Sequence, residues 1–87
     1  MKMEIKYNPK FKQQYNKASS KIKKAFLKRR ILFQNNQRSP LLRNHALTGS
    51  FKGYRSINIT GDWRAIYSEK GNAVIFELLG THSQLYK

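Results

Sequence analysis

The chain has 87 residues, with 18 Lys and Arg against four Asp and Glu, and a formal net charge of +14. This length suits one small domain, residues 1–87, and a hydrophobic content of 39% excludes a disordered chain. The absence of cysteine excludes a disulfide framework and a thiolate metal site, and no apolar run reaches the roughly 20 residues that span a bilayer. We therefore expect a soluble, cytoplasmic protein. Its charge favours a polyanion such as nucleic acid, although an acidic protein, a membrane surface or plain solubility would satisfy it too.

The N-terminal part of the chain predicts a strand followed by two helices. Residues 2–7, KMEIKY, alternate apolar and charged side chains and predict an opening strand. Asn8 as N-cap and Pro9 at the first helical position predict a helix of about ten residues. A basic amphipathic second helix is expected from Lys21 to about Asn35, and the short joint between the two predicts an antiparallel helical hairpin. The apolar stripe of this second helix consists of Ile22, Ala25, Phe26, Leu32 and Phe33.

Beyond Pro40, which ends the helical part, the pattern changes to strands. Three segments, 54–60, 62–68 and 73–79, are bounded by turn residues and predict hairpin-connected strands. The last segment is apolar on both faces, which is typical of a central strand. The expected fold class is α+β, with the short N-terminal strand and the helical hairpin packed on a largely antiparallel four-stranded sheet. The other face of that sheet is expected to be partly open.

The residues that could carry chemistry fall in the second half of the chain. With four carboxylates and two histidines 37 positions apart, a metal centre is poorly supplied with ligands, so any RNA cleavage should need no metal or other cofactor. RNA supplies its own nucleophile, the 2′-hydroxyl, and the protein needs a base, an acid and cations for the phosphorane charge. The candidates are His45 in a polar loop entering the sheet, Asp62 and Arg64 at a strand start, and His82 and Tyr86 beyond the last strand.

Each of these residues also has a purely structural interpretation. His45 suits a loop histidine that bonds the backbone, and Asp62 suits a turn. Arg64 can pair with Asp62 or with a carbonyl group, and Tyr86 can close the core with its ring. Taken one at a time, the structural interpretations are the stronger ones.

The order of these stretches carries more information than any one residue. HALTGSFKGYRSINITGDWRAIY followed by FELLGTHSQLY resembles the RelE/ParE toxin superfamily, and within it the YafQ-type mRNA interferases. The family pattern is similar to H-x-L-x-G-x-[FW]-K-G-x-R, then D-W, then G-T-H-x-x-L-[FY]. The resemblance covers roughly residues 45–86 and implies a RelE-like fold. It also implies the toxin of a type II toxin–antitoxin pair, a ribosome-dependent endoribonuclease that cuts mRNA without a metal. The implied partners are a cognate antitoxin and mRNA on the ribosome, with ribosomal RNA contacts through the basic helices, and no membrane.

The resemblance also implies roles for individual residues. It places the catalytic histidines at His45 and His82, the D-W aspartate at Asp62, and the terminal aromatic that orients the substrate at Tyr86. Arg64 resembles an arginine that RelE-like members carry for phosphate stabilisation, where YafQ-like members often have an aliphatic residue. Which histidine is base and which is acid stays open. The residues expected to bind RNA are Lys52, Arg55 and Asn58.

Asn58 marks a departure from the family. YafQ-like toxins often carry another histidine at this position, and asparagine can hydrogen-bond a substrate but cannot shuttle a proton near neutral pH. Two alternatives therefore remain: a ParE-like toxin that inhibits gyrase, and a non-catalytic homologue that binds only RNA or antitoxin.

Overall fold

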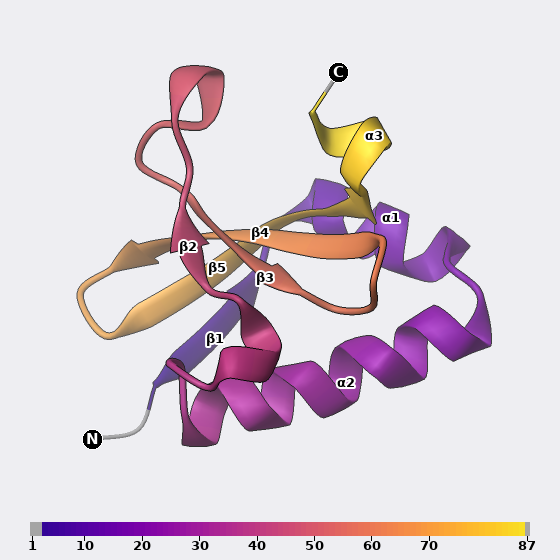
Figure 1. Ribbon diagram of the computed structural model, residues 1–87, viewed down its shortest axis with the longest axis horizontal. Helices are drawn as coiled ribbons and strands as arrows, with labels where there is room; N and C mark the ends of the chain where they lie inside the picture. The colour runs from indigo at the N-terminus through magenta and orange to yellow at the C-terminus, as the bar shows by residue number, and fades with distance from the viewer. Residues whose placement is uncertain (1–2, 87) are drawn as a thin grey trace.

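The computed structural model describes residues 3–86, which form a five-stranded sheet and three α-helices (Figure 1). No helix in this range has both the length and the hydrophobicity needed to cross a bilayer. In chain order the elements are β1 (Glu4–Tyr7), α1 (Pro9–Lys17), α2 (Ser20–Asn35), the 3-10 turn η1 (Pro40–Leu42), β2 (His45–Ala46), the 3-10 turn η2 (Gly49–Phe51), β3 (Arg55–Asn58), β4 (Trp63–Lys70), β5 (Ala73–Thr81) and α3 (His82–Leu85).

Each helix of the helical hairpin begins at a residue whose side chain caps it. The Asn8 side chain accepts a hydrogen bond from the Lys10 backbone N–H at 2.8 Å, and Pro9 takes the first helical position. Ser19 caps α2, and its hydroxyl accepts from the Ile22 N–H at 3.3 Å. The two helices meet through aromatic rings, with the centroids of Phe11 and Phe26 5.1 Å apart. These contacts confirm the predicted Asn8 cap and the pairing of the two helices.

The sheet has five strands in the order β1-β5-β4-β3-β2, so the predicted count of four is wrong. The additional strand is β2, in which His45 pairs with Ser56 and Ala46 with Arg55. Two residues are too few to show an alternating pattern, which is why a loop was expected at His45. The β3–β4 and β4–β5 pairs are antiparallel as predicted. The additional strand β2 is also antiparallel to β3, whereas β1 lies parallel to β5.

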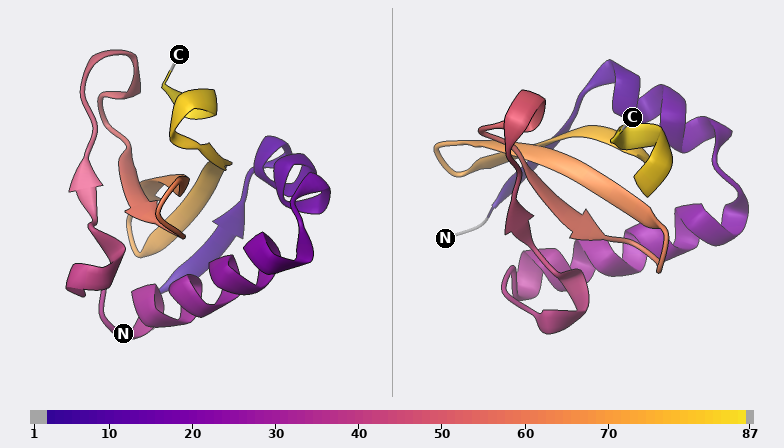
Figure 2. Two further views of the ribbon diagram at one scale, coloured as in Figure 1. Left: turned by 45° about the vertical axis from the view of Figure 1, so that its right-hand side comes forward. Right: turned by 45° about the horizontal axis from the view of Figure 1, so that its top comes forward.

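The two faces of the sheet are covered differently. Helices α1 and α2 cover one face, where the hydrophobic core lies, as the left view of Figure 2 shows. On the other side the segment between β2 and β3 and the short helix α3 project from the sheet together (Figure 1). The face expected to be open is therefore framed by two chain segments. The buried core consists of Phe11, Phe26, Phe33, Leu42, Ile57, Ile59, Ala65, Tyr67, Val74, Phe76 and Leu79.

Candidate active site between the β2–β3 segment and α3

A cleft of about 580 Å³ lies between the β2–β3 segment and α3. It brings together five of the predicted site residues, although they come from four separate stretches of the chain. Polar and aromatic side chains share its walls. The lining residues are Arg43, His45, Ala46, Leu47, Thr48, Phe51, Asn58, Arg64, His82 and Tyr86.

Strand register explains why these side chains meet. His45 lies opposite Ser56, and two residues further along β3 Asn58 lies opposite Arg64. Residues directly opposite each other, and residues two apart on one strand, point to the same face of a sheet. His45, Asn58 and Arg64 therefore share the face that the helices leave free.

His45 is exposed, and one of its ring nitrogens is held by the backbone. Its Nδ1 lies 2.8 Å from the Arg43 carbonyl oxygen. A carbonyl oxygen only accepts hydrogen bonds, so Nδ1 carries a proton. In the neutral ring the lone pair then lies on Nε2. The contact thus orients the ring with a proton-accepting nitrogen available to a ligand.

His82 is placed by a tight turn at the end of β5. Its backbone N–H donates to the Asp62 carbonyl at 2.9 Å, which ties the start of α3 to the β3–β4 turn. Thr81 and Gln84 form a capping box, with bonds of 3.2 Å to the Gln84 N–H and 2.9 Å to the Thr81 N–H. Gly80 allows α3 to fold back, since a Cβ there would lie 3.1 Å from Gln84 Oε1.

Tyr86 packs within an aromatic group on the wall of the cleft. Its ring centroid lies 4.8 Å from that of His82 and 5.8 Å from that of Phe51. The Tyr86 hydroxyl is buried and has no hydrogen-bond partner among residues 3–86. An unpaired buried hydroxyl costs about 1–3 kcal/mol. A polar group of a ligand in the cleft would recover part of this cost.

Arg64 is fixed at one end of its guanidinium group. Its Nη1 donates to the carbonyl oxygens of Thr60, Gly61 and Trp63 at 3.2, 3.0 and 3.1 Å. Arg64 thus makes the hydrogen bonds to carbonyl groups that its purely structural interpretation predicts. It nevertheless leaves Nε and Nη2 without a partner among residues 3–86, and these are the donors that bind a phosphate oxygen.

Three of the predicted site residues do not line the cleft. The Asp62 side chain is exposed on the β3–β4 turn, and Lys52 is exposed beyond η2. Arg55 points to the opposite face because it is adjacent to Ser56 in β3, and its Nε donates to Asn44 Oδ1 at 2.9 Å. Asp62 is nevertheless connected to the cleft, because its carbonyl oxygen accepts a hydrogen bond from the His82 N–H.

Five residues that line the cleft were not predicted as site residues, and Phe51 and Arg43 have the largest side chains among them. Phe51 stands at the aromatic position of the H-x-L-x-G-x-[FW]-K stretch, which is the signal that could have singled it out. Arg43 has a left-handed backbone with φ of 46°, and its sequence neighbourhood shows only that it is basic. Its carbonyl holds His45, so its position depends on the turn and not on a motif.

Comparison with known proteins identifies the family of the chain. Residues 3–87 match the family described as "Bacterial toxin of type II toxin-antitoxin system, YafQ". The mRNA interferase toxin YafQ of Escherichia coli K12 is 41% identical over 44 residues, which make up 51% of this chain and 48% of that protein. The match thus spans about half the length of this curated relative.

Solved structures extend the likeness over the whole fold. The YafQ chain of the E. coli DinJ–YafQ toxin–antitoxin complex superposes with a TM-score of 0.71 at 26% identity and covers 100% of both chains. A YoeB/ParE toxin from Agrobacterium tumefaciens has a TM-score of 0.75 at 16% identity, covering 92% of this chain and 99% of that one, which shows the shared fold alone. The family match, which covers nearly the entire chain, shows that this protein belongs to the YafQ family of bacterial toxins of type II toxin–antitoxin systems.

Proposed function

We propose that the protein is an endoribonuclease that cleaves mRNA on the ribosome and is neutralised by a cognate antitoxin. The observation that carries this proposal is the convergence of His45, His82 and Arg64 in one cleft on the face away from the helices. Two proton-transfer groups and a phosphate-binding cation are the set that cleavage through the 2′-hydroxyl requires. The name of the E. coli relative, an mRNA interferase toxin, supports the same activity.

The proposed reaction uses the ribose 2′-hydroxyl as the nucleophile. His45 takes the proton of this hydroxyl, because its Nδ1–H is held by the Arg43 carbonyl and Nε2 is the accepting nitrogen. The 2′-oxygen then attacks the adjacent phosphorus, and the bond from phosphorus to the 5′-oxygen breaks. His82, as the imidazolium, donates a proton to that leaving oxygen. The Tyr86 ring lies beside His82, with the two ring centroids 4.8 Å apart.

The other cleft residues would bind and orient the RNA. Nε and Nη2 of Arg64 would neutralise the charge that develops on the phosphorane oxygens. Phe51 and Tyr86 provide ring faces on which a base can stack. Asn58 lies opposite Arg64 and would hydrogen-bond the substrate without taking part in proton transfer. Asp62 would act through its carbonyl, which holds the N-terminus of α3.

Neither a metal nor another cofactor enters this proposal. The chain has only four carboxylates, and residues 3–86 contain no group of three or more His, Asp or Glu side chains placed to hold a metal ion. RNA cleavage through the 2′-hydroxyl needs none, because proton transfer and cationic charge come from the cleft residues.

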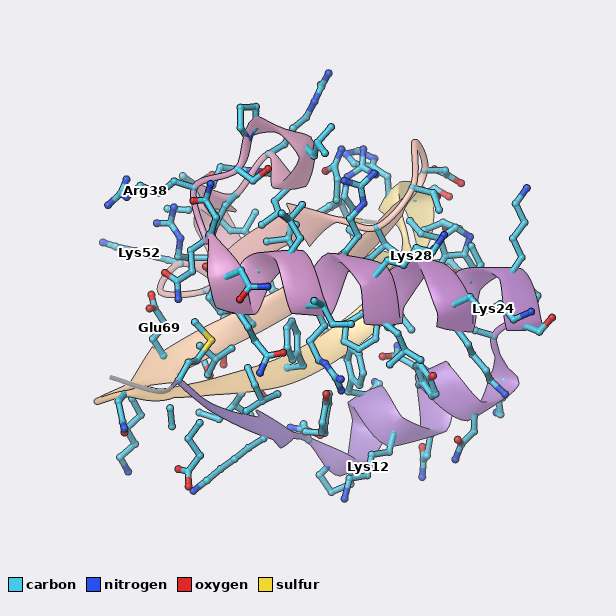
Figure 3. The ribbon with its side chains drawn as sticks, turned by 90° about the horizontal axis from the view of Figure 1, so that it is seen from below. Lys12, Lys24, Lys28, Arg38, Lys52 and Glu69 are labelled. Carbon is cyan, nitrogen blue, oxygen red and sulfur yellow. The ribbon has the colours of Figure 1, made fainter. Side chains whose placement is uncertain are left out.

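We propose two further partners, ribosomal RNA from the charge of the chain and an antitoxin from its relatives. Figure 3 shows Lys24 and Lys28 along α2, on a helix with no acidic residue, and we propose that this surface contacts ribosomal RNA in the cytoplasm. The solved complex of the E. coli YafQ with DinJ supports a cognate antitoxin for this chain. Lys52, exposed on the β2–β3 segment, would bind RNA at the entrance of the cleft.

The test is to map mRNA 5′ ends after induced expression in cells. The wild-type chain should produce cuts in phase with codons, and His45→Ala and His82→Ala should each abolish them. Ser83→Ala is the matched control, because Ser83 is exposed on α3 and does not line the cleft. Thermal unfolding should show that all variants fold. DNA damage without cuts would favour the gyrase inhibitor, and RNA binding without cuts would favour the non-catalytic homologue.

A further inference from the structure

A second polar cavity, of about 500 Å³, lies on the opposite side of the β2–β3 edge from the cleft. Arginines from three separate segments line it: Arg38 after α2, Arg43 after η1, and Arg55 in β3. Arg55 faces this cavity because it alternates with Ser56 and Asn58 along the strand. Arg55, which was expected to bind RNA, therefore faces away from the cleft and lines this cavity with the two other arginines.

Arg55 is held in place by a hydrogen-bonded network. Its Nε donates to Asn44 Oδ1 at 2.9 Å, and the hydroxyl of buried Tyr67 donates to the same oxygen at 3.0 Å. Asn44 Nδ2 in turn donates to the Gln37 carbonyl oxygen at 3.2 Å. Burial raises the pKa of Tyr67, while the hydrogen bond to Asn44 and the nearby Arg55 oppose that rise. The neutral hydroxyl thus remains a donor, and Arg55 lies close enough to Tyr67 to act on its hydroxyl as well as on Asn44.

Arg43 connects the two hollows, since it lines both of them. Its backbone is left-handed, with φ of 46° and ψ of 45°, and it is the single non-glycine residue with positive φ within residues 3–86. Such a conformation costs about 1–3 kcal/mol in a residue with a side chain. The strained residue, Arg43, is therefore also the one that lies between the cleft and the cavity.

The charges around the cavity are not neutralised by the protein. Glu69 is the one carboxylate that lines it, against three arginines. The only ion pair within residues 3–86 joins Lys6 to Glu4, so no carboxylate lies within 4.0 Å of these guanidinium groups. Figure 3 shows Arg38 and Glu69 at the end of the molecule where α2 ends. An unpaired arginine cluster around a positioned guanidinium is the arrangement that binds phosphate.

We propose that this cavity binds a second backbone phosphate of the RNA whose reacting phosphate occupies the cleft. The strand would pass over the β2 edge beside Arg43, which contacts both hollows. This inference rests on the proposed RNA cleavage and extends it by a subsite. Arg38 and Arg55 would bind RNA away from the reacting phosphate, so their substitution should affect RNA affinity and not the rate of the chemical step.

The experiment measures binding of an oligoribonucleotide that is 2′-O-methylated throughout and therefore cannot be cut. Arg38→Gln and Arg55→Gln are compared with Lys17→Gln, which removes one exposed charge from α1 outside both hollows. Fluorescence anisotropy at several salt concentrations gives the dissociation constant and its salt dependence. A dinucleotide and inorganic phosphate, followed by NMR, are the two smaller probes.

We expect Arg38→Gln and Arg55→Gln each to weaken oligonucleotide binding about tenfold, the value of one charge-assisted hydrogen bond. The slope of log K against log salt should fall by about 0.7 for each lost phosphate contact. Lys17→Gln should change both values much less. Binding of the dinucleotide, which reaches only the cleft, should be the same in all of these variants.

Equal losses in all three variants would overturn the proposal, because only the overall charge would then matter. Phosphate binding lost in Arg38→Gln and Arg55→Gln with unchanged oligonucleotide binding would overturn it as well, since the cavity would then be an anion site unrelated to RNA. Arg38 is exposed and its side chain makes no hydrogen bond within residues 3–86, so its variant tests the proposal even if Arg55→Gln disturbs folding. Failure of the proposed cleavage would show separately, as wild-type chain that produces no mRNA cuts or as cuts that persist in His82→Ala.

Discussion

Gly80 offers the sharpest test of how α3 positions His82. A Cβ at residue 80 would lie 3.1 Å from Gln84 Oε1 and 3.3 Å from both Cγ and Cδ2 of Leu85. These contacts are tighter than ordinary van der Waals separations, so in Gly80→Ala the side chains of Gln84 and Leu85 must shift, and we expect α3 to move with them. Gln84 would then lose its bond to the Thr81 N–H, which now measures 2.9 Å.

The expected cost can be worked from these contacts. Overpacking a well-packed site costs about 1–3 kcal/mol, and loss of one hydrogen bond costs about 1 kcal/mol. We expect the free energy of unfolding to fall by about 2 kcal/mol, which lowers the Tm of a chain of this size by about 8–16 °C. Because the geometry of the reacting groups sets the cleavage rate, a small displacement of His82 together with α3 should also slow RNA cleavage.

Gly61→Ala provides the matched control for this change. It adds the same methyl group, but a Cβ at residue 61 would meet nothing within 4 Å. Scanning calorimetry and a single-turnover cleavage assay should therefore show a large effect for Gly80→Ala and almost none for Gly61→Ala. Equal Tm values and equal cleavage rates in the two variants would refute the argument that close packing at Gly80 sets the position of His82.

Three further predictions concern Arg64, Tyr86 and Tyr67. Arg64→Gln should lower kcat for RNA cleavage by about 10²–10³-fold with a smaller change in KM, because charge on the phosphorane develops only in the transition state; an effect on KM alone, in steady-state kinetics, would argue against this role. Tyr86→Phe should keep or raise the Tm, because the hydroxyl it removes is buried and unpaired, while cleavage slows; a clear loss of Tm would contradict it. Burial raises the pKa of Tyr67, so the neutral hydroxyl stabilises the fold fully below the ordinary tyrosine pKa of about 10, and this stability is lost as the pH rises from there towards the higher folded pKa. Urea unfolding at increasing alkaline pH should therefore show a shallower loss of stability in Tyr67→Phe than in the wild type, and identical slopes would count against that assignment.

The parts of the fold that could be predicted are those with local causes. Asn8 and Pro9 start α1 because a side-chain cap and a fixed φ act within one turn of the helix. The strand β2 could not be predicted, because its two residues are extended only through pairing with β3. Helix α3 was overlooked although Thr81 and Gln84 have the spacing of a capping box, which is a signal readable from sequence.

Which residues line the cleft depends partly on the alternation of side chains along each strand and partly on the register between neighbouring strands. Arg55 and Asn58 are three residues apart in one strand, so the sequence alone places them on opposite faces. That Asn58 and Arg64 meet His45 and His82 could not be predicted, because it depends on the β2–β3 and β3–β4 registers and on the fold of the 46–54 segment. The family resemblance grouped most of these residues without showing their geometry.

The parallel pairing of β1 with β5 also governs when the protein can fold during its own synthesis. Glu4 to Tyr7 pair only with residues 73–76, so the first strand has no neighbour in the sheet until residues 73–76 have left the ribosomal exit tunnel. Contacts this distant in sequence form late, because the long loop between them must close first. His82 and Tyr86 emerge later still. A nascent chain therefore has no completed cleft until these residues have joined the sheet.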